Sequence, residues 1–249
     1  MQKEMDELKK KFYEIKNKEW IESAREDFGG IGITFEKLLG IESNELEIPD
    51  FGEIEIKTKT CGSNSQTTLF NCVPTGPHYH EVERLKELYG YPDSILKSSN
   101  VLNVELKCNK MVKIKTNFYF MIKINYESKK IYLFIYNKNK SLIEKSVYWD
   151  FDILEEKLYR KLKYLAIVMA KKKLINGKKY FKYYKMEVLR LKSFETFIKL
   201  IENGDVNISF KIGVFRTGKK AGKIHDHGTS FVIGEYNIHK LYERIELYY

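Results

Sequence analysis

The sequence lacks several features that would place the protein in a particular class. None of its apolar runs approaches the roughly 18 residues of a membrane-spanning helix, and the start, MQKEMDELKKKFYEIK, has no signal-peptide core. There are only three cysteines, Cys61, Cys72 and Cys108, and they form no C-x-x-C pair. A disulfide framework and a typical zinc site are therefore disfavoured. We expect a soluble intracellular protein with reduced thiols and no membrane partner.

Acidic residues are scarce relative to basic ones, and the net charge is +10. The excess is uneven, because residues 1–96 carry 12 Lys and Arg against 19 Asp and Glu, whereas residues 97–249 carry 32 against 15. A cationic surface of this size most often binds a polyanion, usually nucleic acid. The alternative is a lysine-rich composition with a solvated surface.

Hydrophobic residues at 43% and aromatic residues at 14% predict a folded protein, either one large domain or two joined lobes. Apolar periodicity predicts helices over 3–27, 33–40, 78–90, 150–177, 193–204 and near 237–245. Alternating or β-branched stretches predict strands over 45–48, 53–58, 67–73, 101–108, 111–126, 130–138, 178–191, 207–215 and 231–236. This mixture indicates an α/β or α+β fold with a mixed sheet and a lobe boundary near residue 150.

The stretch LEIPDFGEIEIKTKT, residues 46–60, gathers acidic side chains in a basic protein. Strand alternation puts Ile54 and Ile56 on the core face and aims Glu55 and Lys57 together toward the other face. A turn after Pro49 brings Asp50 toward Glu55. Two converging carboxylates repel each other unless a cation lies between them, and oxygen ligands with room for water suit Mg²⁺. A neighbouring lysine stabilises charge on a phosphate, so the set has the parts to hydrolyse a phosphodiester. The alternative is an ordinary solvated strand face.

PDFGEIEIKT resembles the PD-(D/E)xK nuclease motif, and its flanks GGIGITFEKLLG and TTLFNCVPTG are similar to those of MutH and of the MvaI/BcnI restriction endonucleases. The resemblance implies a restriction-endonuclease-like core with a second DNA-recognition lobe. Residues 1–150 would then be mainly catalytic and residues 151–249 mainly DNA-reading. The interval from Asp50 to Glu55 is shorter than in MutH, which favours restriction over a MutH-like nicking repair enzyme.

By the same resemblance, Asp50 and Glu55 are Mg²⁺ ligands, Lys57 is the catalytic lysine and Glu36 accompanies the site. Glu36 is otherwise an ordinary helix-surface charge. The expected protein is a monomeric type II enzyme of the bacterial cytoplasm that cuts double-stranded DNA and leaves 5′-phosphates. Its target would be a short G·C-rich pseudo-palindrome, CC(A/T)GG in the MvaI branch of the family. A cognate methyltransferase would be its genetic partner. A DNA-binding protein without a working site is the alternative from another class.

Side chains that read bases are expected on FRTGKKAGKIHDHGTS, residues 215–230, interpreted as a loop between strands. Arginine and lysine pair with guanine, and acidic groups accept from cytosine. The candidates there are Arg216, Lys219, Lys220, Lys223, His225, Asp226, His227 and Thr229, with the lysines expected on phosphates. His225 and His227 also suggest a metal pair, which is the weaker interpretation because a third ligand is missing.

A second candidate is VPTGPHYHEVERLKELYG, residues 73–90, in which a turn is followed by His78 and His80 at the entry of a helix. This turn either contacts the minor groove or simply starts the helix with exposed histidines. The lysine- and aromatic-rich residues 171–185 fit contact with the DNA backbone, although their aromatic side chains also suit a core.

Overall fold

The structure, a computed structural model, describes residues 1–26, 29–41, 48–63 and 65–249. The chain divides into two compact units, each assembled from separate segments. Unit 1 contains residues 1–65, 158–193 and 238–249, and unit 2 contains residues 66–157 and 194–237. In the part of the chain that is described, no helix is long and apolar enough to cross a membrane. Among the described residues, none of the three cysteines forms a disulfide.

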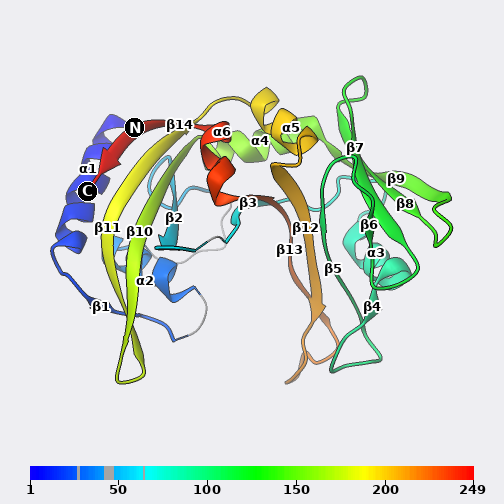
Figure 1. The fold of residues 1–249 in the computed structure, drawn as a ribbon, viewed down its shortest axis with the longest axis horizontal. Helices are drawn as coiled ribbons and strands as arrows, with labels where there is room; N and C mark the ends of the chain where they lie inside the picture. The colour runs from blue at the N-terminus through cyan, green and yellow to red at the C-terminus, as the bar shows by residue number, and fades with distance from the viewer. Residues whose placement is uncertain (27–28, 42–47, 64) are drawn as a thin grey trace. The chain divides into compact units, whose positions relative to one another are not determined.

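Unit 1 is built on a mixed five-stranded sheet (Figure 1). Its strands are β1 (Ile21–Glu22), β2 (Ile54–Thr60), β10 (Tyr164–Ile175), β11 (Lys178–Leu191) and β14 (Tyr242–Tyr248). Its helices are α1 (Gln2–Lys16), α2 (Gly30–Leu39) and α6 (Ile238–Leu241). β2 pairs in parallel with β10, β10 pairs antiparallel with β11, and both β1 and β14 pair with β11. The β10–β11 hairpin extends beyond β2, which pairs only as far as Ala170 (Figure 1).

The core of unit 1 lies between α1, α2 and one face of this sheet. Helix α1 contributes Met5, Leu8, Phe12 and Ile15 at three- and four-residue spacing, as an amphipathic helix requires. From β2, Ile54 and Ile56 enter the same core, which confirms the face predicted for them. These two isoleucines fix the register of β2, because a slip by one residue would turn them out of the core.

Unit 2 contains two antiparallel sheets. One has the order β3 (Thr67–Asn71), β13 (Ile224–Ile233), β12 (Val206–Val214), β5 (Asn100–Leu106), β4 (Tyr91–Pro92). The other has the order β6 (Val112–Lys113), β7 (Tyr119–Asn125), β8 (Lys130–Tyr136), β9 (Leu142–Asp150). Its helices are α3 (Glu81–Tyr89), α5 (Phe194–Glu202), the 3₁₀ turn η1 (Glu235–Asn237) and most of α4 (Phe151–Leu162).

The mixed α+β class is confirmed, whereas three predicted helices are too long. The helix over 150–177 ends at Leu162, and β10 follows. Leu165 to Val168 are all buried, as in a central strand covered on both faces, and such a run has no alternation to distinguish it from a buried helix. The first helix ends at Lys16, and the last spans four residues before β14. Residues 45–47 of one predicted strand lie outside the described residues.

The units do not follow the boundary predicted near residue 150. Residue 150 lies within unit 2, and residues 158–193 return to complete the sheet of unit 1. The physical reason is strand pairing, since β2 obtains its hydrogen-bonding partner from β10, far along the chain.

Candidate active site

Strand β2 holds Glu55 and Lys57 next to each other on the face opposite Ile54 and Ile56, as alternation predicts. Their side chains form an ion pair between Lys57 Nζ and Glu55 Oε1. Glu55 does not lie on a solvated strand face, which was the alternative interpretation of this stretch, because its residue exposure is 0%. Strand β2 pairs in parallel with β10, and the buried Tyr242 lies close enough to Glu55 that burial and the charge of Glu55 both raise the pKa of its hydroxyl. The site is therefore a buried carboxylate beside a lysine that is 30% exposed.

Asp50 reaches the same strand through a tight turn. Phe51 and Ile54 exchange backbone hydrogen bonds of 2.9 Å, and Gly52 between them has a φ of 59°, a conformation that favours glycine. The turn brings Asp50 Oδ2 within 2.9 Å of the Ile56 backbone N–H, which donates to it. The backbone of β2 thus fixes the carboxylate of Asp50 beside the strand that carries Glu55.

The two oxygens of Glu55 have different surroundings. Oε1 accepts from Lys57 and lies 3.5 Å from Nζ of Lys161, which sequence reasoning missed. Oε2 is buried and has no hydrogen-bond partner among the described residues. Burial raises the pKa of Glu55, the two lysines lower it, and Asp50 raises it further. A buried carboxylate oxygen without a partner is costly, so it marks a place where a cation would be stabilising.

Glu36 comes to this site from helix α2. Its side chain is half-buried, and burial together with the charge of Asp50 raises its pKa, while Lys57 opposes the shift. A Cβ on Gly32, one turn earlier, would lie 3.5 Å from Glu36 Oε1 and 3.4 Å from Thr58 Oγ1 of β2, so the helix approaches the strand closely here. The structure therefore brings together all four residues that the sequence singled out for catalysis.

The donor set fits a hard divalent cation that keeps several waters. Within the described ranges, no group of three or more His, Cys, Asp or Glu side chains is placed to hold a metal ion by itself, so water or substrate would have to complete the coordination. Asp50 and Glu55 provide two carboxylates, and Glu55 Oε2 accepts no hydrogen bond from any residue that the structure describes. One or two carboxylates are what Mg²⁺ uses in sites where waters and substrate phosphates complete its coordination.

Arg216 in unit 2 is held by an acidic partner. Its Nη2 and Nε donate to the two carboxylate oxygens of Asp93 at 2.9 and 3.2 Å. Asp93 also accepts from the backbone N–H groups of Ile95 and Leu96, and these contacts lower its pKa. The Arg216 side chain remains 51% exposed. The guanidinium is thus oriented by a buried carboxylate and still accessible.

The other candidates in 215–230 are only partly on a loop. Lys219, Lys220 and Lys223 lie on the exposed connection, whereas β13 begins at Ile224 and includes His225, Asp226, His227 and Thr229. The ring of His225 stacks on Phe215 with centroids 4.1 Å apart. Both rings line a pocket of about 340 Å³ that also includes Arg216 and Asp93. Thr229 was predicted to read DNA, but it is fully buried on β13. The structure therefore does not expose it to DNA.

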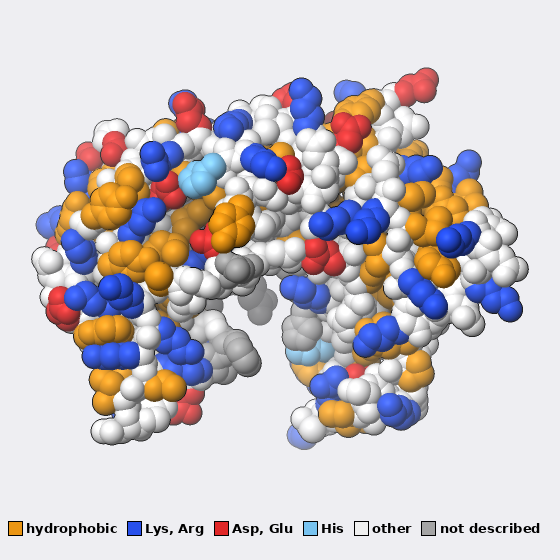
Figure 2. Space-filling model, in the orientation of Figure 1, with side chains coloured by type: hydrophobic (Ala, Val, Ile, Leu, Met, Phe, Trp, Pro, Cys, Tyr) orange, Lys and Arg blue, Asp and Glu red, His pale blue; other side chains and the backbone are white. Residues whose placement is uncertain are grey.

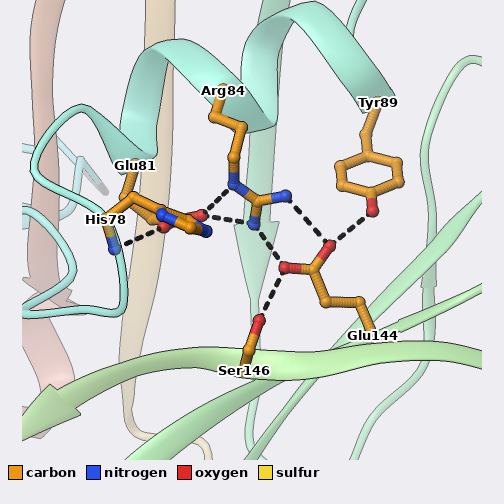
Figure 3. Close-up of polar contacts among 6 residues, drawn as sticks. All are labelled: His78, Glu81, Arg84, Tyr89, Glu144 and Ser146. Carbon is orange, nitrogen blue, oxygen red and sulfur yellow. Dashed lines mark hydrogen bonds and ion pairs between the residues drawn. The ribbon is translucent and has the colours of Figure 1, made fainter.

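The turn that carries His78 and His80 is anchored to unit 2 by a network of polar side chains (Figure 3). Glu81 accepts from the backbone N–H of His78 at 3.1 Å and from Arg84, and Arg84 continues to Glu144 on β9. Tyr89 and Ser146 also donate to Glu144. Within this anchored turn His80 is exposed, and Tyr79 beside it is 95% exposed. The turn therefore presents side chains to solvent from a fixed backbone.

Lysine and arginine side chains are spread over both units on the face seen in Figure 2, and acidic ones lie among them. In the β10–β11 hairpin, Lys178 and Lys182 pair with Glu22 and Glu19, while Lys173 lies over the ring of Trp20. Part of the predicted basic surface is thus neutralised within unit 1.

A sequence model of the MvaI/BcnI restriction endonuclease family matches residues 9–242. A solved structure described as a complex of restriction endonuclease MvaI with its cognate DNA substrate is 36% identical, covers 98% of both chains and has a TM-score of 0.90. One of MvaI in the absence of DNA is 35% identical, with a TM-score of 0.62 over 99% of this chain and 98% of that one. No curated protein sequence matches. The chain therefore belongs to the MvaI/BcnI restriction endonuclease family and is a type II site-specific deoxyribonuclease.

Proposed function

We propose that this enzyme binds double-stranded DNA and cuts both strands at a short G·C-rich pseudo-palindrome in a Mg²⁺-dependent reaction that leaves 5′-phosphates. CC(A/T)GG is the first target to test, because the solved relatives are structures of MvaI. The observation that carries the proposal is the buried Oε2 of Glu55, which lies beside Asp50 and Lys57 and has no hydrogen-bond partner in the described part of the chain. A protein that only binds DNA gains nothing from such a costly arrangement.

Family membership implies dependence on a divalent metal, and we propose that the metal is Mg²⁺, held by Asp50 and Glu55. When bound, such an ion polarises the phosphodiester and lowers the pKa of a coordinated water. The Ile56 N–H keeps Asp50 in place, and burial keeps Glu55 from rotating into solvent. Lys57 stabilises the negative charge that develops on the phosphate, and Glu36 orients water at the edge of the site.

We assign DNA cleavage to unit 1 and base reading mainly to unit 2. The exposed guanidinium of Arg216 and the ring of His225 are the proposed base contacts, with Asp226 and His227 next to them on β13. Lys219, Lys220 and Lys223 are proposed to contact phosphates, and His78 and His80 to contact the minor groove. Asp93 orients Arg216 for this role, as a carboxylate does for a bidentate guanidinium.

The enzyme is proposed to act as a monomer in the bacterial cytoplasm, with a cognate methyltransferase protecting the host's own sites. A monomer has one cleavage centre and must cut the two strands in separate events. A nicked intermediate should therefore accumulate early during cleavage of a supercoiled plasmid. The mass of the DNA-bound protein, measured by analytical ultracentrifugation, tests directly whether one copy binds each site.

The decisive experiment is digestion of plasmid DNA by the purified protein. Discrete fragments are expected with Mg²⁺ and none with Ca²⁺ or EDTA. Sequencing the fragment ends gives the target, the cut position and the end chemistry together. Random degradation, or cleavage that persists in EDTA, would refute the proposal.

A further inference from the structure

Two lysines converge on a single oxygen of Glu55, and they come from different parts of the chain. Lys57 is on the same strand, two residues away, whereas Lys161 belongs to the last turn of α4. Its Nζ lies 3.5 Å from Oε1 of Glu55, and its side chain is 26% exposed. Lys161 belongs to no part of the PD-(D/E)xK motif.

The backbone around Lys161 is held firmly within unit 1. Its neighbours Leu158 and Leu162 are buried. The hydroxyl of Tyr242, itself buried, donates to the carbonyl oxygen of Leu162 at 3.3 Å. Two residues after Leu162, Tyr164 begins β10 opposite Ile54, the residue before Glu55. The packed residues before and after Lys161 thus hold its ammonium group close to Glu55.

The charges around Glu55 suggest a role for Lys161. A buried ionised carboxylate is destabilised when its cationic partner is removed. If Lys57 were that donor, it would remain on Oε1 and would not be available to a phosphate. A second lysine on the same oxygen removes this conflict, because one can leave while the other stays.

We propose that Lys161 is a positioning residue that holds Oε1 of Glu55 during cleavage, so that Lys57 is released to the phosphate and Oε2 stays directed at the cation. The inference rests on the proposed function, in which Lys57 acts on the substrate and Glu55 binds the metal. In this role Lys161 acts through Glu55 and not by contact with the DNA or the reacting atoms.

Lys161→Met should slow DNA cleavage and yet strengthen the binding of divalent cations. The turnover number should fall about tenfold to a hundredfold, with KM for DNA within about twofold, because Lys57 is then retained by Glu55. Divalent cations should bind the DNA-free protein about threefold to tenfold more tightly, because a like charge beside the site has gone. Damage to the fold would instead lower the turnover number and also weaken cation binding.

The test combines cleavage kinetics on a duplex with one target site and Mn²⁺ binding to DNA-free protein, followed by electron paramagnetic resonance. Lys161→Arg keeps the charge and should restore turnover to within about threefold of the wild type. Lys163→Met removes the same charge two residues away, at an exposed position, and should change both quantities less than twofold. If Lys161→Met does not fold, Lys161→Gln serves in its place.

Wild-type turnover in a folded Lys161→Met protein, or weaker Mn²⁺ binding together with slower turnover, would overturn the inference. Failure of the proposed function looks different. In that case the wild-type protein itself cuts no DNA, or Lys57→Ala cuts at the wild-type rate.

Discussion

The carboxylates of Glu144 and Asp93 in unit 2 and of Glu55 in unit 1 are satisfied to different extents. In unit 2, Glu144 receives donors from Arg84, Tyr89 and Ser146, and Asp93 receives a guanidinium and two backbone N–H groups. In unit 1, Glu55 is more deeply buried, yet its Oε2 has no partner among the described residues. A fully satisfied carboxylate stabilises the fold, whereas one left incomplete is available to a ligand. The presence or absence of hydrogen-bond partners, and not burial alone, separates these structural carboxylates from Glu55, the proposed metal ligand.

Charge, by contrast, does not separate the units. Unit 1 carries 24 Lys and Arg against 18 Asp and Glu, and unit 2 carries 20 against 16. The imbalance along the sequence largely disappears, because the basic residues 158–193 pair with the acidic N-terminal part. Net charge therefore does not identify the DNA-reading unit.

The largest expected effect tests this contrast at Glu55. Glu55→Gln should lower the cleavage rate about a thousandfold while leaving the melting temperature unchanged or raised, because the substitution removes a buried charge. Plasmid cleavage and thermal unfolding of the same preparation measure both. Near-normal cleavage would remove Glu55 from the metal site, and a large loss of stability would show that its role is structural.

A smaller effect is expected from Arg216→Ala in unit 2. Losing a base contact should weaken binding to the target by about 1–3 kcal/mol, with little change for unrelated DNA. Lys219→Ala should instead weaken both and reduce the slope of log affinity against log salt by about one. Titrations in Ca²⁺ at several salt concentrations distinguish the two. Equal losses on both DNAs would reduce Arg216 to a phosphate contact.

Glu144→Gln is the counterpart of the Glu55 substitution. Arg84 would lose a charged acceptor, and we expect a loss of about 1–3 kcal/mol in unfolding free energy. At a temperature where the protein is folded, the cleavage rate should stay within about twofold. Denaturant unfolding and plasmid cleavage check these outcomes. A cleavage defect without a stability defect would contradict the structural role of the network.

The smallest effect concerns acid stability. Burial opposes ionisation of Glu144, but donors from Arg84, Tyr89 and Ser146 outweigh it and lower its pKa. A lowered folded-state pKa gives stability that is present above the ordinary glutamate pKa and lost as the pH falls through the folded-state value. The stability difference between wild type and Glu144→Gln should therefore shrink on acidification. Melting temperatures from pH 7 to pH 3.5 measure it, and a constant difference would contradict the linkage.

Local pattern predicted part of this molecule well. Alternation placed Ile54 and Ile56 in the core and Glu55 beside Lys57, because these are properties of one strand. The run from Leu165 to Val168 was assigned to a helix, since periodicity cannot distinguish a strand buried on both faces from a buried helix. Because this run was interpreted as a helix, the parallel pairing of β2 with β10 was not predicted. That pairing depends on tertiary contacts.

The same limit explains the residue that was missed. Lys161 approaches Glu55 only because α4 ends just before β10. The one signal in the sequence was a lysine near the end of a helical pattern, directly before an apolar run, and such lysines are common on helix ends. Arg216, by contrast, was predicted to contact DNA from the composition of residues 215–230. Its ion pair with Asp93 could not be predicted from the sequence.

The interleaved order of the two units has a consequence for synthesis on the ribosome. Strand β2 is made before residues 66–157 of unit 2, and β10 and Lys161 come after them. At about 5–20 residues per second, roughly 5–20 s separate β2 from its partner strand. A nascent chain therefore carries Asp50 and Glu55 without the sheet that organises them, and the order of translation delays the proposed DNA-cutting centre until most of unit 2 has been made.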